Sequence, residues 1–341
     1  MSREFRCSRC NSPLDVTPDT IVIVCRYCGQ LNWIRKDLKF DVYITPTKSI
    51  EDARRILKHR IGGRRISREL LLYLPFYLVD VTCDVDYEGD FIVTVVKEKV
   101  RRRDGETIIE TETRYIPVHV KGRLEGERSK IPVVARKGVG GSMIRHLGSH
   151  LIGSDIEPIE IKDFELDRKT SKSILGAELD SKEAIDIAID EHLDNLRTYV
   201  KRLMEDEARA EASVYGTPTI VNTQRLRITP LNIEANTSPL TYYPIYVFNY
   251  GGRGEYKAYV TGWDLYPILL EEPMPIWSRL AWILGGILGS TALSTIFLFI
   301  ASRIESVFQL LGAGVLFLIP AGYISFYSVK KALRPVRVES G

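Results

Sequence analysis

Two cysteine pairs, Cys7-Ser-Arg-Cys10 and Cys25-Arg-Tyr-Cys28, decide how the chain begins. A two-residue gap lets the backbone curl so that both sulfurs of a pair face one cation, and a short hairpin between the pairs completes a tetrahedron. Residues 21–24 (Ile-Val-Ile-Val) have the pattern of a strand that runs into the second pair. Two disulfides or four unrelated thiols are the alternatives, but no thioredoxin-like pattern surrounds the pairs. We therefore predict a zinc ribbon over residues 1–36 with Zn²⁺ as cofactor, its ligands being Cys7, Cys10, Cys25 and Cys28.

Composition and charge place few limits on the whole chain but say more about its parts. The 341 residues carry a formal net charge of +3, with 45% hydrophobic residues, which is ordinary for a folded protein. Residues 1–70 hold 15 Lys and Arg against 8 Asp and Glu, so positive charge is concentrated there. Only Cys83 lies outside the two pairs, which favours a reducing compartment, and no secretory signal is visible.

The C-terminal region contains two long uncharged stretches, Leu280–Ile300 and Val307–Val329. At 1.5 Å per helical residue, each is long enough to cross a hydrocarbon layer of about 30 Å. A buried pair of core helices is the alternative, but the short connection favours a transmembrane hairpin over residues 276–329. Gly285 and Gly289 permit close helix packing, either within the hairpin or between copies in a homo-oligomer.

The distribution of basic residues around these stretches predicts an orientation. Residues 330–341 form a basic tail, whereas the connecting loop holds only Arg303, next to Glu305. Because positive charge accumulates on the cytoplasmic side, and two spans return the chain to its starting side, we predict that the tail and the N-terminal part are both cytoplasmic. The predicted localisation is therefore the cell membrane, with two passes.

The middle of the chain, residues 37–275, contains a repeat. The segments Tyr73-Leu-Pro-Phe-Tyr77 and Tyr242-Tyr-Pro-Ile-Tyr246 share a pattern, and each precedes a Gly-containing stretch and a second apolar run. We predict β-hairpins near 73–96 and 242–262, with a charged hairpin between them that closes at Asp104-Gly105. Further strands are expected at residues 118–124 and 131–135.

A helix is predicted before each repeated hairpin. Ser49 with Asp52 and Asp180 with Glu183 resemble capping boxes, which open helices at 50–59 and 181–212. The longer helix carries an apolar stripe, which predicts either packing across a sheet or a coiled-coil contact between protomers. The stripe consists of Ile185, Ile189, Leu193, Leu196, Val200 and Leu203. The predicted fold class is α+β, with a zinc ribbon, a duplicated helix-plus-β-hairpin cytoplasmic domain and a two-helix transmembrane hairpin.

Several short motifs resemble those of membrane-anchored zinc-ribbon proteins of bacteria and archaea, which are labelled as containing a transcription-factor-IIB-type zinc ribbon or as similar to the primosomal helicase. The motifs are Tyr73–Tyr77 with Asp80, Asp86–Gly89, Ile131–Arg136, the acidic helix, Tyr243–Tyr246 with Gly262, and a terminal apolar segment entered through a tryptophan. The resemblance implies zinc binding and membrane attachment but no activity. Thr261–Asp264 departs from the longer turn of that family, and no GxxxxGK[ST] loop is present to bind a nucleoside triphosphate.

Two other groups of residues bear on function. Gly138–Gly141, with Arg145, His146 and His150, invites a phosphate or metal interpretation, but it lacks the strand–loop–helix pattern and a third ligand. A basic cluster fits anionic lipid headgroups at a membrane surface, nucleic-acid phosphates, or simply a solvated helix face. It comprises Arg54, Arg55, Lys58, Arg60, Arg64, Arg65 and Arg68.

We therefore expect a non-catalytic interaction or scaffold module at the cytoplasmic face of a membrane, with a protein partner that the sequence does not name. The alternative is a membrane-tethered zinc-ribbon protein that binds nucleic acid or acts in transcription. A third interpretation, an enzyme that uses the 138–150 loop, has less support, because no nucleophile–base pair is apparent in the sequence.

Overall fold

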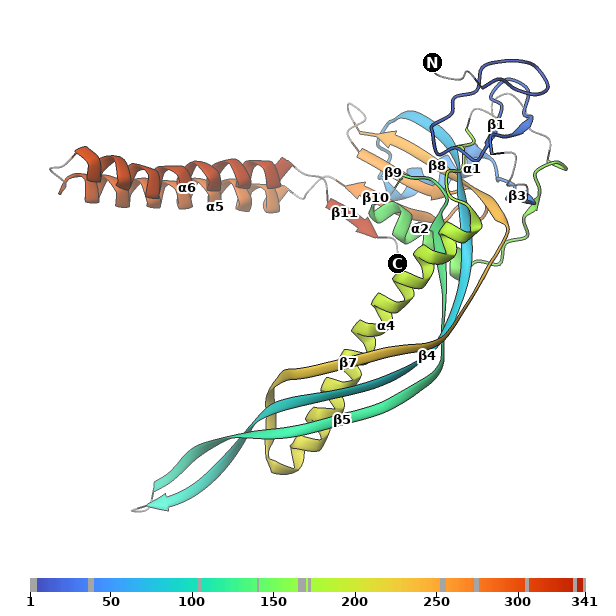
Figure 1. Cartoon of the computed structure of the whole chain (residues 1–341). Helices are drawn as coiled ribbons and strands as arrows, with labels where there is room; N and C mark the ends of the chain where they lie inside the picture. Colours follow the sequence, from blue (N-terminus) through green and yellow to red (C-terminus); the bar gives the residue numbers. More distant parts are fainter. Residues whose placement is uncertain are drawn as a thin grey trace. The chain divides into compact units, whose positions relative to one another are not determined.

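The chain is a mixed α+β protein that forms two compact units (Figure 1). The computed structural model describes residues 5–35, 40–103, 106–139, 141–164, 170, 173–251, 256–272, 276–303, 307–333 and 336–339. The first unit comprises Met1–Thr47 and Leu71–Pro244, and the second comprises Lys48–Leu70 and Ile245–Gly341. The chain therefore passes from one unit to the other between Thr47 and Lys48, within strand β4 (Ile66–Arg103) and within strand β8 (Leu240–Tyr250).

The ribbon at the start of the first unit is a small hairpin. Strands β1 (Val22–Val24) and β2 (Leu31–Trp33) pair antiparallel, with Val24 opposite Leu31. Strand β3 (Val42–Ile44) pairs parallel with the beginning of β8 (Leu240–Tyr250) and antiparallel with β6 (Ile159–Glu160). Val22 and Val24 belong to the same buried cluster as Tyr73 and Tyr77, so strand β1 of the ribbon packs in the core of the first unit.

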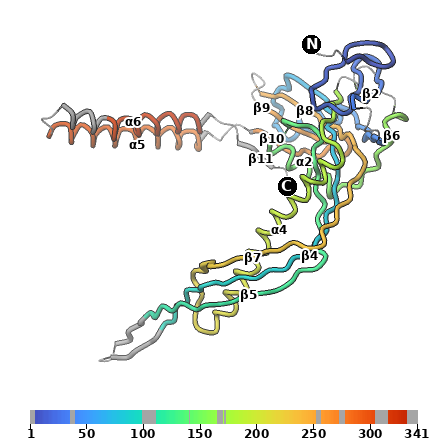
Figure 2. The backbone as a smooth tube through the Cα atoms, in the orientation of Figure 1, coloured from blue at the N-terminus to red at the C-terminus, as the bar shows by residue number. Residues whose placement is uncertain are grey.

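Three long strands and a helix form what we call the arm. Strand β4 (Ile66–Arg103) lies between β5 (Glu106–Val134) and β7 (Thr217–Thr237), antiparallel to both. The β4–β5 ladder runs from Phe76 opposite Val134 to Arg103 opposite Glu106, whereas β7 follows β4 only as far as Val96. Figure 2 shows β5 and β7 on either side of β4. The charged hairpin predicted to close at 104–105 is confirmed by this ladder, although those two residues lie outside the described part. The strands predicted at 118–124 and 131–135 are parts of the single strand β5.

Helix α4 (Ser181–Ala212) covers one face of the arm and has the predicted bounds. Asp180 and Glu183 form the predicted capping box. Leu196 and Val200 of the predicted apolar stripe are buried, and its other four members are partly buried and pack against the core. The fully buried positions also include alanines and Met204. The buried residues recur at every fourth position: Ala184, Ala188, His192, Leu196, Val200, Met204, Ala208 and Ala212. Since four residues turn a helix by 40° more than a full circle, this stripe winds around α4 and follows the twist of the strands. Of the two interpretations of this helix, packing across a sheet is confirmed.

The hairpin predicted near 73–96 is wrong, because β4 continues straight through Gly89. Gly89 does not turn the chain; it lets α4 approach the sheet. A Cβ at that position would lie 2.8 Å from Met204 Cε and 3.1 Å from the Phe91 ring. With one strand in place of a hairpin, and with β7 between α4 and β8, the predicted duplication of a helix-plus-hairpin unit does not hold.

The second unit contains the hairpin predicted near 242–262. The later part of β8 pairs antiparallel with β9 (Tyr256–Thr261), which pairs with β10 (Pro267–Glu272). Helix α1 (Ile50–Arg60) belongs to this unit and is capped by Ser49, whose hydroxyl accepts a hydrogen bond from the Asp52 N–H. Both features were predicted from local signals in the sequence.

Helices α5 (Ile276–Ala301) and α6 (Val307–Leu333) of the second unit pack side by side. Strand β10 leads into α5, and after α6 the strand β11 (Val336–Glu339) pairs antiparallel with β10. Of the predicted tail at residues 330–341, the described part lies in the last turn of α6, which includes Lys330 and Lys331, and in strand β11. In the pairing of β10 with β11, Glu272 lies opposite Val336.

Among the described residues, one helix, Trp277–Ala301, is long and apolar enough to cross a membrane, and only 6% of its apolar window is buried. The first predicted span is therefore supported as a candidate membrane helix. The second predicted span forms helix α6, but the described residues of α6 do not qualify as a candidate membrane helix.

Candidate metal centre

The two cysteine pairs have the same backbone geometry. In the first, the Asn11 N–H donates to the Cys7 carbonyl at 3.0 Å, and in the second the Gly29 N–H donates to the Cys25 carbonyl at 2.9 Å. Asn11 and Gly29 both have positive φ angles, 59° and 74°, which Asn and Gly adopt more readily than other residues. Each pair is thus a tight turn that presents two sulfurs to the same side.

The four thiols come together as the spacing predicted. All four Sγ atoms lie within 4.8 Å of one another, with Cys7 and Cys28 at 3.6 Å and Cys10 and Cys25 at 3.7 Å. These distances exceed a disulfide bond of about 2.05 Å, and none of the cysteines is bridged. This compact tetra-cysteine site is able to bind a metal ion. It is the only group of three or more metal-ligating side chains that the described residues bring together.

Asn32 on β2 forms hydrogen bonds with residues of the first cysteine pair. Its Oδ1 accepts hydrogen bonds from the Ser8 N–H and hydroxyl at 2.9 and 3.1 Å. Its Nδ2 donates to the Gln30 carbonyl at 2.6 Å and to Cys7 Sγ at 3.6 Å. Because the amide is buried and uses both of its ends, it fixes the first turn relative to β2.

The environments of the thiols differ. The Ser12 hydroxyl and N–H lower the pKa of Cys10 to about 6, whereas burial raises the pKa of Cys28 to about 12. Four neighbouring thiolates repel one another, so a cation bound among them favours deprotonation of all four and releases protons as it binds.

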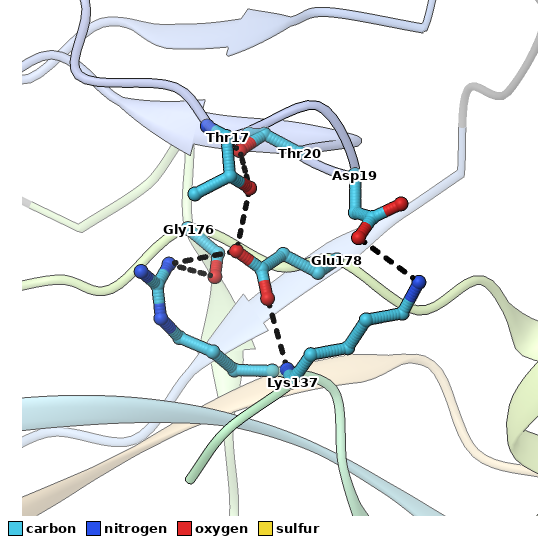
Figure 3. A network of polar contacts seen from close by, with 7 residues as sticks. Thr17, Asp19, Thr20, Lys137, Gly176 and Glu178 are labelled. Atoms are coloured by element: carbon cyan, nitrogen blue, oxygen red, sulfur yellow. Dashed lines mark hydrogen bonds and ion pairs between the residues drawn. The ribbon is translucent and has the colours of Figure 1, made fainter.

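A buried glutamate joins the ribbon to the body of the first unit (Figure 3). Glu178 is 5% exposed, and its carboxylate accepts hydrogen bonds from the Thr17 hydroxyl at 2.6 Å and the Lys137 N–H at 2.9 Å. Arg136 Nη1 lies 3.6 Å from the same carboxylate and donates to the Gly176 carbonyl at 3.0 Å. At the edge of this network, Lys137 Nζ pairs with Asp19 at 3.1 Å. Backbone hydrogen bonds between β1 and Ala177 add a second connection.

The predicted basic cluster lies in the second unit, on and after α1, and is only partly free. Arg54 makes two hydrogen bonds of 2.6 Å with the carboxylate of Glu69, and Arg55 lies 3.3 Å from Asp52. The other five side chains are exposed: Lys58, Arg60, Arg64, Arg65 and Arg68. The Arg55 side chain is itself 73% exposed, so six of the seven cations face solvent and Arg54 is half-buried.

The 138–150 segment is a glycine turn followed by a helix. Gly138 and Gly141 have φ angles of 73° and 100°, and Gly141 precedes α2 (Ser142–Gly153). Gly140 lies outside the described residues. The helix packs against β5 and carries His146 and His150, but no third metal-ligating side chain joins them among the described residues. The phosphate or metal interpretation of this segment gains no support from the described residues.

One polar contact was not predicted. Cys83 on β4, His192 on α4 and Ser129 on β5 meet between the helix and the sheet, with Cys83 Sγ 3.4 Å from His192 Nε2 and Ser129 Oγ 2.6 Å from His192 Nδ1. Burial raises the pKa of Cys83 and lowers the pKa of His192. Since both side chains are more than nine-tenths buried, this contact belongs to the core and is not an accessible nucleophile–base pair. No local motif signals this contact in the sequence, because His192 does not belong to the predicted apolar stripe.

Comparison with protein-family models, with curated proteins and with solved structures finds no match to this chain. Its resemblance to membrane-anchored zinc-ribbon proteins thus stays a prediction.

Proposed function

We propose that this chain is a membrane-anchored zinc-ribbon protein that acts as a non-catalytic interaction module, with the first unit and the sheet of the second unit on the cytoplasmic side and α5 and α6 in the membrane. Four features support the proposal: the tetra-cysteine site, the connection of the ribbon to the core, the pairing of β10 with β11, and exposed apolar side chains on the arm.

Zinc is the metal that fits the site best. A tetrahedron with metal–sulfur bonds of about 2.3 Å has edges of about 3.8 Å, close to the two Sγ–Sγ distances of 3.6 and 3.7 Å. Four thiolates form a closed coordination shell without an open position for substrate, which is typical of structural zinc sites. Because Val22 and Glu178 bind the ribbon to the body, we assign the metal a structural role.

The main observation in favour of a membrane anchor is the antiparallel pairing of β10 with β11. Strand β10 precedes α5 and β11 follows α6, so the two ends of the helical hairpin lie on the same side of any membrane it enters. A single crossing would separate the two paired strands. The apolar and largely exposed α5 therefore requires α6 as a second, returning span. Lys330 and Lys331 at the strand end, against Arg303 at the other end, favour a cytoplasmic position for the sheet.

The arm offers a surface for a protein partner. On the face opposite α4, Tyr115 of β5 and Ile220 of β7 flank Thr94 of β4, and they are 69% and 56% exposed. Neighbouring pairs on the same face are charged, such as Asp90 with His119 at 2.7 Å. An apolar pair with a charged surround, on a sheet that α4 stiffens, is typical of a protein interface.

Photocrosslinking in native membranes tests the interaction role. A photoreactive residue at Tyr115 of the full chain is expected to link one specific protein, and the link should be lost in Ile220→Ser. As a matched control, a photoreactive residue at Tyr199, exposed on α4, should not link that protein. A chain that links nothing at Tyr115, or that turns over a small molecule after purification, would contradict the proposal.

Binding to nucleic acid remains the alternative, and the six exposed cations on and after α1 favour it specifically. The purified full chain in detergent would then shift a labelled oligonucleotide in a salt-dependent manner. That shift should disappear in the Arg60→Gln/Arg64→Gln/Arg65→Gln variant and persist in Arg54→Gln, because Arg54 is engaged with Glu69.

A further inference from the structure

The helical hairpin contains a groove between α5 and α6 near its connection to the sheet. Its volume is about 500 Å³, and its lining includes Trp282, Gly285, Gly286, Tyr323, Ile324 and Tyr327. Gly285 forms an open floor, since a Cβ there would meet no atom within 4 Å. Tyr323 and Tyr327 stack with ring centroids 6.2 Å apart, and Tyr327 meets Trp282 edge-on at 6.4 Å. The groove is therefore apolar, with aromatic walls.

Cations lie at the end of the groove that is closer to the sheet. Lys331 Nζ is 4.2 Å from the centre of the Trp282 ring and 5.7 Å from that of Tyr327. Arg279 lies one turn before Trp282, and its Nε is buried without a hydrogen-bond partner among the described residues. No ion pair of Lys331 or Arg279 occurs within the part of the chain that the structure describes. Among the described residues, neither cation is thus neutralised by a direct ion pair.

From this combination we infer that the groove binds one anionic phospholipid, with its phosphate against Lys331 and Arg279 and an acyl chain over Gly285. The inference rests on the proposed membrane anchor. Trp282 lies about 9 Å along α5 from Ile276 at 1.5 Å per residue, which places it and Lys331 at headgroup depth and Gly285 deeper. A second copy of the chain fits less well, because it would bring the same cations against Lys331.

Quenching of tryptophan by brominated lipid tests the assignment. The full chain carrying Trp277→Phe, which leaves Trp282 as the tryptophan of the hairpin, is placed in nanodiscs with brominated phosphatidylglycerol or brominated phosphatidylcholine at equal mole fraction. We expect the anionic lipid to quench more strongly. Lys331→Gln should reduce this preference about fivefold, which corresponds to about 1 kcal/mol for one cation at an anionic surface. Gly285→Leu, which fills the floor, should remove the quenching excess.

Gly322→Leu is the matched control. It adds the same side chain to another open position of the hairpin that does not line the groove, so the lipid preference should stay. Equal quenching by the two lipids, or a preference that survives both groove variants, would overturn the inference. Crosslinking of Gly285→Cys to a second chain would also overturn it, in favour of a dimer. Failure of both lipids to quench Trp282 would instead reject the membrane anchor itself.

Discussion

The hydroxyl of Thr17 donates a 2.6 Å hydrogen bond to the carboxylate of Glu178, 161 residues later in the chain. Thr17 lies between the two cysteine pairs and Glu178 lies just before α4, so this contact holds the ribbon on the body of the first unit (Figure 3). A buried carboxylate is stable only when its charge is compensated, and here Arg136 and the Lys137 N–H provide that compensation.

Replacement of Glu178 by Gln should therefore destabilise the first unit. The amide keeps the shape of the side chain but leaves the half-buried Arg136 without its carboxylate. We expect the free energy of unfolding to fall by about 2 kcal/mol, measured by chemical denaturation of the full chain in detergent. As a control, Asp15→Asn removes the exposed pair with Arg26 and should cost less than about 0.5 kcal/mol. If both variants lost the same free energy of unfolding, the buried contact of Glu178 would contribute no more stability than an exposed ion pair.

Metal binding should depend on Asn32 as well as on the cysteines. We expect one zinc ion per purified chain and loss of that ion in Cys10→Ser, measured by atomic absorption. Asn32→Ala removes the hydrogen bonds to Ser8 and to Cys7 Sγ, so metal affinity should fall at least about 10-fold in a competition assay with a chromophoric chelator. Gln30→Ala should leave affinity unchanged, because the Gln30 side chain donates to the Leu31 carbonyl and, among the described residues, makes no hydrogen bond to a cysteine. If the Asn32→Ala variant bound the metal as tightly as the parent chain, Asn32 would not position the cysteine ligands.

The parts of the fold that sequence could predict are those fixed by neighbouring residues. The tetra-cysteine site follows from spacing, and the start of α4 follows from the capping residues Asp180 and Glu183. Gly89 misled the prediction because a glycine needed for close packing under Met204 gives the same signal as a glycine in a turn. The Thr17–Glu178 contact has no local signal, since it depends on how distant segments meet. The predicted apolar stripe of α4 missed the buried alanines. A prediction from hydrophobicity selects large apolar side chains, whereas a helix that packs closely on a sheet places small side chains such as alanine at the contact.

The buried His192 predicts an acid-sensitive core. Burial lowers its pKa in the folded chain, and the charge of Glu127 opposes this to a smaller extent. The unfolded chain therefore binds a proton at a higher pH, near 6.5, than the folded chain does. The stability that neutral His192 contributes is complete above about pH 6.5 and is lost as pH falls from there toward the folded-state pKa.

His192→Gln should weaken this dependence, because the amide stays neutral and can still bond Ser129 and Cys83. We expect a smaller loss of unfolding free energy between pH 7 and pH 5 than in the parent chain, measured by denaturation at both values. His119→Gln, at an exposed position on the arm, serves as the control for replacing a histidine. If the His192→Gln variant lost as much stability as the parent over this range, His192 would not be the titrating group.

Two adjacent glycines should respond differently in the helical hairpin. A Cβ at Gly286 would lie 2.6 Å from Ser328 Cβ on α6, whereas a Cβ at Gly285 would meet nothing within 4 Å. Gly286→Ala should therefore force α5 and α6 apart and cost about 1–3 kcal/mol, and Gly285→Ala should be close to neutral. Thermal unfolding of the two variants in the same detergent measures the difference, because each adds one methyl group to the same turn of α5. Equal melting temperatures would mean that α5 and α6 do not pack at Gly286, and the hairpin would then need another contact to hold β10 and β11 together.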